Sequence, residues 1–228
     1  MKKDDSIVFT PNQLGKIIRI LDDKGVNHKK LQSVLESGHF ADFAEAIATS
    51  DFGKIKRDDF RRLILPHFKA NFKVWKSIVI GTPLRTADDF RRDLKNDGYR
   101  INGWGNNVLD QKDFTVAKKM HNIDLVVVSV ADLYFKEGAI QRDIYARAKE
   151  IGLGLCPAEV GPQLRLQYKD QPRGECLWIG MEYIRDSDGY PLVFDVAHND
   201  VGQWLCGHLG EPGHFWAADD LFVFVARK

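Results

Sequence analysis

One cysteine and two histidines lie close together near the end of the sequence, at Cys206, His208 and His214. In an extended chain, residues 206 and 208 project to the same side, and three glycines and one proline between 207 and 213 let the loop bend around an ion. Thiolate and imidazole groups are common zinc ligands, and Asp219 or Asp220 offers a further one. The pattern therefore suggests a zinc site, although it matches no strong zinc motif and a glycine-rich loop between strands needs no ion.

A second group of candidate catalytic residues combines one arginine with three carboxylates: Glu159, Arg165, Glu182 and Asp195. The alternation of polar and apolar residues over 163–168 predicts a strand that carries Arg165 on its polar face. If the carboxylates reach this arginine, the group can bind an anion or work as acid and base. The alternative is a solvated sheet face with cross-strand ion pairs.

Several familiar catalytic motifs are missing from the sequence. It contains neither the G-x-x-x-x-G-K-[ST] phosphate loop nor the G-x-S-x-G serine motif. Cys156 follows the end of a predicted helix, where nothing lowers a thiol pKa, so we expect a buried, inert cysteine. Asp186 and Asp188 resemble part of a calcium loop, but Ile184 stands at the first ligand position and Asp188-Gly189 is explained by a hairpin turn.

The first 70 residues predict a helical subdomain. Thr10-Pro11 gives an N-cap followed by proline at the first helical position. Apolar residues then recur at helical spacing over 14–21, 31–35, 40–47 and 60–64. Four short amphipathic helices cannot each bury an apolar face alone, so we expect them to pack together or on the rest of the chain.

Residues 71–228 predict a second domain of class α+β (mixed α/β). Its first half alternates a strand at 77–80, a helix at 86–98, a strand at 123–130 and a helix at 139–151, which predicts a small βαβ-like layer. Its second half carries five short apolar segments, which predict an antiparallel C-terminal sheet, at 163–168, 176–184, 192–196, 203–206 and 221–225.

Residues 152–168, GLGLCPAEVGPQLRLQY, are similar to a segment of a family of uncharacterised bacterial proteins. The stretch 175–184, the turn at 186–189 and the segments around Trp204 and Trp216 fit the same resemblance, which covers about residues 72–228. The family has no assigned function. The resemblance therefore implies a bacterial, cytosolic protein and transfers no catalytic residue.

Charge and composition narrow the class of protein. The net charge is +1, and residues 156–228 carry 6 basic and 11 acidic side chains, so no strong basic field favours nucleic acid. An odd number of cysteines, three in all, predicts reduced thiols. No apolar run reaches the length of a membrane helix, and Met1 is followed by charged residues rather than an apolar segment. We therefore expect a cytoplasmic protein that does not bind membranes.

These observations favour a cytosolic bacterial binding or interaction protein without catalytic activity, with another protein as its partner. One alternative is a metal-assisted hydrolase or nuclease-like enzyme that uses the 206–214 loop or the Arg165 sheet face. Another is a nucleic-acid-binding accessory protein that acts through the basic N-terminal helices. Zinc is the one cofactor that the sequence suggests.

Overall fold

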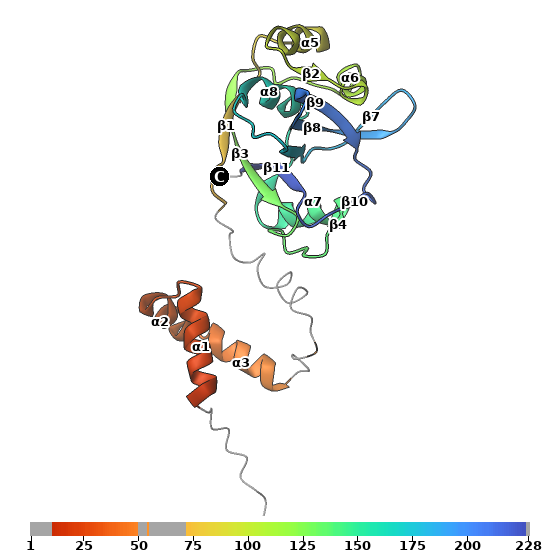
Figure 1. The fold of residues 1–228 in the computed structure, drawn as a ribbon. Coiled ribbons are helices and arrows are strands. Elements are labelled where there is room, and N and C mark those ends of the chain that lie inside the picture. Colours follow the sequence, from red (N-terminus) through yellow and green to blue (C-terminus); the bar gives the residue numbers. More distant parts are fainter. Residues whose placement is uncertain (1–10, 50–53, 55–71, 227–228) are drawn as a thin grey trace, which may run out of the picture. The chain divides into compact units, whose positions relative to one another are not determined.

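The computed structural model describes residues 11–49, 54 and 72–226 (Figure 1). The chain divides into two compact units, Met1–Lys56 and Arg57–Lys228, and each is described here by itself. The domain boundary between residues 70 and 71 that the sequence suggests lies within a stretch outside the described residues, and it stays a prediction.

The described residues of the first unit form three helices, α1 (Pro11–Asp23), α2 (His28–Glu36) and α3 (His39–Thr49). Helix α1 begins at Pro11, as the sequence predicts. Helix α2 begins after Asn27, whose side chain accepts a hydrogen bond from the Lys30 backbone N–H at 3.0 Å. The three predicted helices are therefore present, and the fourth, over 60–64, lies outside the described residues.

None of the side chains described in this helical unit is buried. Nine large apolar side chains keep between 37% and 59% of their surface exposed: Leu14, Ile17, Ile18, Ile20, Val34, Leu35, Phe40, Phe43 and Ile47. Short helices owe most of their stability to the packing of an apolar face rather than to intrinsic propensity. The helical unit, as described, has no core of its own.

We therefore expect a fragment of residues 1–56 to show weak helicity and a broad, non-cooperative thermal transition by circular dichroism. A fragment of residues 72–228 contains both buried clusters described below and is expected to unfold in one sharp transition. A sharp, cooperative transition in the 1–56 fragment would contradict the first expectation.

The second unit is built on one large mixed sheet. Along the sheet the strands follow the order β1-β3-β11-β6-β8-β9-β2, while β5 pairs with β11 and β7 with β8. The strands are β1 (Lys76–Ile80), β2 (Arg100–Ile101), β3 (His121–Ser129), β5 (Leu153–Gly154), β6 (Cys176–Ile179), β7 (Ile184–Arg185), β8 (Pro191–Asn199), β9 (Gly202–Leu209) and β11 (Leu221–Ala226). A small second sheet pairs β4 (Ala139–Ile140) with β10 (Phe215–Trp216). The helices are α5 (Ala87–Asn96), α6 (Gly103–Leu109), α7 (Gln141–Glu150) and α8 (Val160–Gln167).

The predicted class, α+β, is confirmed, but the arrangement of the strands differs from the expected one. Strands β1 and β3 pair antiparallel, whereas a βαβ unit needs parallel strands. Strand β11 pairs parallel to β6, and β2 pairs parallel to β9. The C-terminal strands thus join β1 and β3 in one mixed sheet instead of forming a separate antiparallel one.

Residues 163–168 do not form a strand, and that prediction is wrong. Residues 163–167 belong to helix α8 and Tyr168 caps its end, while Pro162 lies in the first turn, where a missing N–H costs no hydrogen bond. Val160 and Leu164, four residues apart, are fully buried on one side of the helix. A short segment of polar and apolar residues can fit both the two-residue period of a strand and the 3.6-residue period of a helix. Here the helix is favoured because it buries Val160 and Leu164 on one side.

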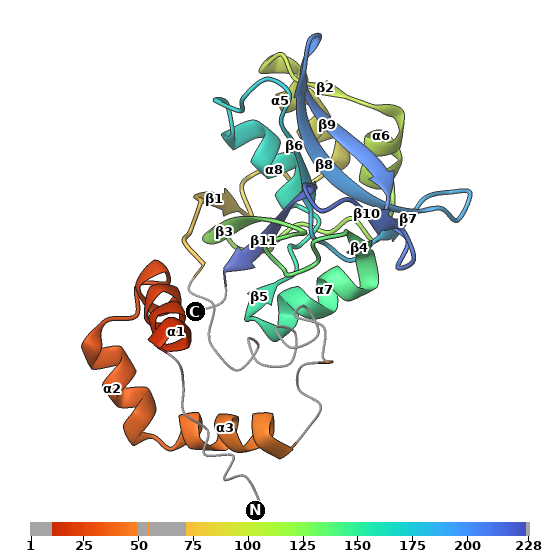
Figure 2. The same ribbon diagram turned by 60° about the horizontal axis from the view of Figure 1, so that its bottom comes forward.

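The sheet has a different cover on each of its two faces. Helix α8 packs on one face, where Val160 and Leu164 join the larger buried cluster with Phe194, Val196 and Leu205. Helix α7 packs on the other face, over β3 and β11, where Ile144, Tyr145 and Ala148 join a second cluster with Phe222 and Phe224. Figure 2 shows α7 and α8 on opposite sides of the sheet. Within the described ranges, no helix combines the length and the apolar character that crossing a membrane requires.

Candidate functional site

The candidate site lies on the part of the α7-side face that strands β6, β8 and β9 form. Trp178 on β6 and Cys206 on β9 are the cross-strand neighbours of Asp195 on β8. Because side chains alternate along a strand, the residues two positions away point to the same side. We call this surface the Asp195 face; its members are Cys176, Trp178, Asp195, Trp204, Cys206 and His208. All of them are half-buried except Asp195.

Asp195 is a buried carboxyl group that has thiols for partners. Its side chain is 4% exposed, and the thiol of Cys176 donates to Oδ2 at 3.5 Å. The Cys206 thiol donates to the same carboxyl group. Burial raises the pKa of Asp195 to about 7, and the two thiol hydrogen bonds oppose this rise. Near neutral pH, Asp195 therefore exists in both its acid and its ionised form.

The two thiols stay protonated beside this carboxyl group. Burial, followed by the charge of Asp195, raises the pKa of Cys206 to about 12 and raises that of Cys176 further. The nucleophilic form of a cysteine is its thiolate. Cys176 and Cys206 thus act here as hydrogen-bond donors and not as nucleophiles.

Aromatic rings close one end of the Asp195 face. The His208 ring lies 4.7 Å from Trp178 and 5.7 Å from Trp216, measured between ring centroids. His214 lies 4.6 Å from Trp216 and 5.5 Å from His208. Burial lowers the pKa of His208, and the nearby His214 lowers it further. His208 therefore presents a neutral imidazole at neutral pH.

The loop that carries His214 and Trp216 is fastened to helix α7. The backbone N–H of Gln141 donates to the His214 carbonyl at 2.9 Å, and the Gln141 side chain donates to the Gly210 carbonyl at 2.8 Å. Trp178 donates from Nε1 to Asp220 at 3.3 Å. The indole N–H of Trp216 is buried and has no hydrogen-bond partner in the described structure. This end of the face is thus held in place and keeps one unsatisfied donor.

The zinc hypothesis finds little support in this geometry. Within the described residues, no group of three or more His, Cys, Asp and Glu side chains could hold a metal ion. His208 and His214 lie together, but the Cys206 thiol is directed to Asp195. The three candidate metal ligands Cys206, His208 and His214 therefore do not form a set that could hold an ion within the described structure.

Arg165 does not lie on a sheet face. Its side chain is fully buried on helix α8, where it donates to Gln171, to the Tyr168 carbonyl and, at 3.0 Å, to Gln203 Oε1. Its guanidinium lies over the Tyr99 ring, 4.8 Å from the centroid. Because Gln203 and Asp195 point to opposite faces of the sheet, Arg165 and Asp195 are separated by the sheet itself. The predicted Arg165 sheet face is wrong because this segment is a helix.

The other two predicted carboxylates also lie apart from Asp195. Glu159 is fully buried and accepts hydrogen bonds from the backbone N–H groups of Gly81 at 2.7 Å and Ala117 at 2.8 Å. It joins the loop after β1 to the segment before β3. Glu182 is an exposed residue that pairs with Lys149 at 3.7 Å. The expected convergence of three carboxylates on Arg165 therefore does not occur.

Cys176, Trp178 and Trp204 complete the face and Trp216 borders it, and none of these four residues was among the candidate site residues of the sequence analysis. A signal was present, because Cys176 and Trp178 occupy alternate positions of the strand predicted over 176–184, and Cys206 and His208 alternate in the same way along an extended chain. The order in which the strands pair was missing from that reasoning. Only the pairing of β8 between β6 and β9 brings the three segments together.

A comparison of the chain with protein-family models, with curated proteins and with solved structures finds no match. The resemblance of residues 72–228 to uncharacterised bacterial proteins is therefore neither supported nor contradicted.

Proposed function

We propose that this is a cytoplasmic binding protein and that its Asp195 face binds an uncharged small molecule that contains a ring. The observation that carries the proposal is a buried carboxyl group, Asp195, on a sheet face whose surrounding aromatic side chains stay half-exposed. Binding sites for small molecules commonly combine aromatic surface with a few well-placed polar groups.

The polar groups of the face support a ligand with hydrogen-bonding edges. Asp195 accepts hydrogen bonds when ionised and donates one when protonated, and its pKa of about 7 keeps both forms available. His208 adds a neutral imidazole. Trp178 and Trp204 offer indole surface against which a ring can pack.

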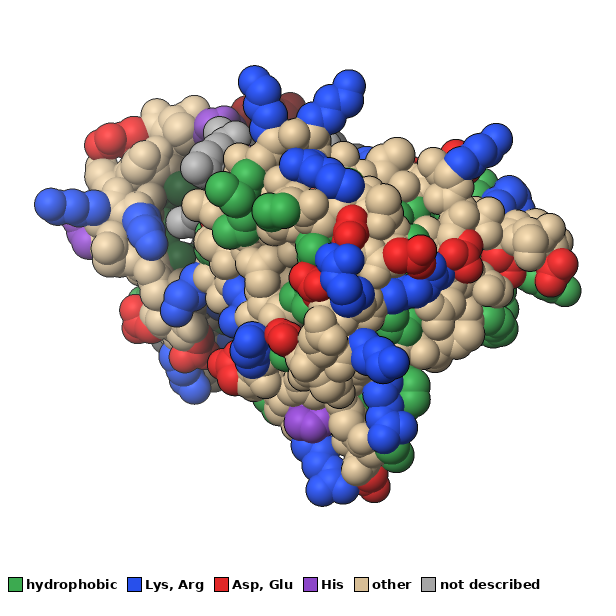
Figure 3. All heavy atoms as spheres, turned by 90° about the horizontal axis from the view of Figure 1, so that it is seen from above, with side chains coloured by type: hydrophobic (Ala, Val, Ile, Leu, Met, Phe, Trp, Pro, Cys, Tyr) green, Lys and Arg blue, Asp and Glu red, His purple; other side chains and the backbone are tan. Residues whose placement is uncertain are grey.

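The charge of the surroundings favours an uncharged ligand. Arg100, whose guanidinium lies 5.4 Å from the centroid of the Trp204 ring, stands at the edge of the face. The six members of the face include no lysine or arginine. In the view of Figure 3, acidic and basic side chains are interspersed and form no continuous basic field. Polyanions such as nucleic acid need such a field, so they fit the surface seen in this view less well.

The test is a titration of the full chain with uncharged monosaccharides and uncharged nucleosides, followed by NMR. The protein has five tryptophans, and each gives a separate indole N–H signal. We expect the signals of Trp178 and Trp204 to shift on binding. The signal of Trp75 is the internal control, because Trp75 packs against Tyr168 and is not part of the face.

The variant Asp195→Asn separates binding at this face from binding elsewhere. An ionised hydrogen-bond acceptor contributes more than a neutral one, so at pH 8 we expect affinity to fall at least ~10-fold. The affinity of the unmodified protein should also rise between pH 6 and pH 8 as Asp195 ionises, and that of the variant should not. Failure of the whole panel to shift Trp178 or Trp204, or equal affinity in both proteins, would overturn the proposal.

A second candidate function is acid–base catalysis without a metal, which the pKa of Asp195 near 7 favours. A catalytic role predicts that a ring ligand bound at the face is converted to product. Asp195→Asn should then abolish turnover and leave the dissociation constant nearly unchanged, which is the opposite of the result expected for a binding protein.

A further inference from the structure

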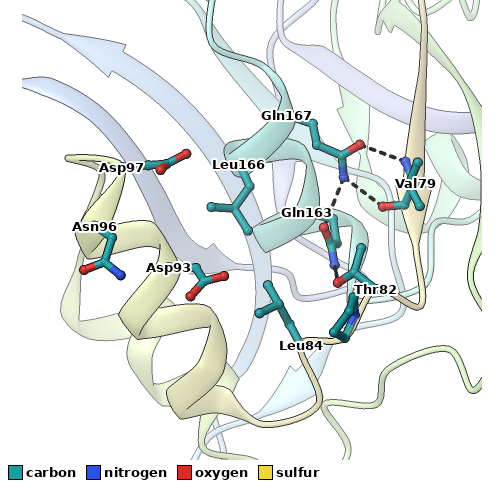
Figure 4. Close-up of a pocket in the computed structure, with 10 residues that line it drawn as sticks. Val79, Thr82, Leu84, Asp93, Asn96, Asp97, Gln163, Leu166 and Gln167 are labelled. Carbon is teal, nitrogen blue, oxygen red and sulfur yellow. Dashed lines mark hydrogen bonds between the residues drawn. The ribbon is translucent and has the colours of Figure 1, made fainter.

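A groove lies on the opposite side of the sheet from the Asp195 face, between helices α5 and α8 (Figure 4). Its volume is about 540 Å³. Asp93 and Asn96 on α5, with Asp97 directly after its end, form one wall, and Leu166 on α8 and Leu84 in the loop before α5 line the groove as well. Its size is within the range of small-molecule sites, roughly 300–1,000 Å³.

The amide side chains in the α8 wall are already engaged. Gln167 accepts from the Val79 N–H and donates to the Val79 carbonyl, both at 2.8 Å. Gln163 donates to the Thr82 hydroxyl at 2.6 Å. These bonds, drawn in Figure 4, fix α8 along the outer edge of β1. The wall is therefore preformed, and its amides hold the groove open rather than select a ligand.

Apolar side chains dominate the rest of the groove. Leu84 and Leu166 belong to the partly buried residues that pack on the main core, so one side of each is supported and the other is turned to the groove. Val79 and Pro83 extend this apolar lining. Such a surface favours contact with an aliphatic chain, because removing apolar area from water stabilises the complex.

The α5 wall is acidic. Asp93 lies in the last turn of α5, and Asp97, four residues later, caps the C-terminal end of the helix, so the two carboxylates lie at that end. The helix dipole is negative at this end and adds to the attraction of a cation. The residues that line the groove include these two carboxylates and no lysine, arginine or histidine.

The cations that now pair with these carboxylates lie outside the groove lining. Arg92 contacts Asp93 at 3.2 Å, and Lys169 contacts Asp97 at 3.4 Å. The side chains of Arg92 and Lys169 are 59% and 71% exposed. Ion pairs of this exposed kind contribute little to stability, so a ligand cation can compete with them.

We propose that this groove binds a small aliphatic cation, with its ammonium group at Asp93 and Asp97 and its hydrocarbon chain along Leu84 and Leu166. The charge of the lining selects the ammonium group, and the leucines select the chain. The contributions of the ammonium group and of the hydrocarbon chain to affinity can be measured separately, because ligands that lack one of these groups can be tested. The inference does not depend on the function proposed for the Asp195 face.

The test is a backbone NMR titration of the full chain with n-pentylammonium, with 1-pentanol and methylammonium as probes that each lack one feature. We expect n-pentylammonium to shift the amide signals of residues 82–84, 93–97 and 163–167, with a dissociation constant of about 1 mM. We expect 1-pentanol and methylammonium to bind at least ~10-fold more weakly.

Variants of the protein test whether Asp93 and Asp97 bind the ammonium group. Asp93→Asn with Asp97→Asn should weaken n-pentylammonium binding at least ~10-fold. Asp88→Asn is the matched control, since Asp88 is on the same helix, pairs with Arg91 and does not line the groove, and it should leave binding unchanged. Equal binding of n-pentylammonium and 1-pentanol by the unmodified protein, or unchanged binding in the double variant, would overturn the proposal without bearing on the Asp195 face.

Discussion

Replacing Asp195 with asparagine is expected to make the protein more stable above pH 7 and to leave its stability near pH 4 almost unchanged. Asp195 is 4% exposed and has two thiols as partners, so ionising it in the folded protein is costly. Asparagine has nearly the same shape and still accepts a hydrogen bond from a thiol. It removes the charge and keeps the packing.

The direction of the pH dependence follows from the raised pKa of Asp195. In the unfolded chain this carboxyl group loses its proton near pH 4, and in the folded protein it does so near pH 7. Between these values the folded state binds more protons than the unfolded state, so stability falls as pH rises. A difference of about 3 pH units corresponds to about 4 kcal/mol in the free energy of unfolding, lost between pH 4 and pH 7.

Urea unfolding of both proteins at several pH values measures this effect. The difference in unfolding free energy between Asp195→Asn and the unmodified protein should grow by about 4 kcal/mol from pH 4 to pH 8. Asp143→Asn is the control, because Asp143 is exposed on α7 beside Arg142, and its difference should stay within about 0.5 kcal/mol. A difference for Asp195→Asn that does not change with pH would show that this carboxyl group is not buried as described.

The fold class was predictable from the sequence because a long apolar run rich in β-branched residues fits few structures other than a buried strand. The run that became β3 is rich in β-branched residues, and β3 pairs on both sides inside the sheet, with β1 and β11. Strand pairing was not predictable in the same way. The parallel neighbours β6 and β11 are far apart in the sequence, and nothing local in either segment specifies that partner.

The candidate site was predictable only in part, because residue types can be read from the sequence but the pairing of distant strands cannot. Asp195, Cys206 and His208 were selected by residue type, and a regular hairpin places them on one face. Arg165 was grouped with Asp195 because the segment 163–168 was interpreted as a strand, although a helix fits its pattern as well. Contacts with a distant segment favour the helix over the strand here. Glu159 and Gln163 are both buried and hydrogen-bonded to the segment after β1, and sequence periodicity does not reveal such contacts.

Replacing Arg165 with methionine is expected to destabilise the protein by about 4 kcal/mol. Methionine fills much of the same volume but cannot donate a hydrogen bond. It would leave acceptors on Gln171, Tyr168 and Gln203 without their present donor inside the protein. It would also remove the contact of the guanidinium with the Tyr99 ring. Burial lowers the pKa of Arg165, which reflects the cost that these contacts offset.

Arg173→Met is the matched control for Arg165→Met. Arg173 also pairs through its guanidinium, with Asp200, but its side chain is 64% exposed, so water can replace the pairing. We expect this variant to change the unfolding free energy by less than about 0.5 kcal/mol. If Arg165 bound an anionic ligand instead, Arg165→Met would leave the melting temperature unchanged and abolish ligand binding. Equal stability of the two variants would therefore mean that the buried contacts of Arg165 do not hold helix α8 to the sheet.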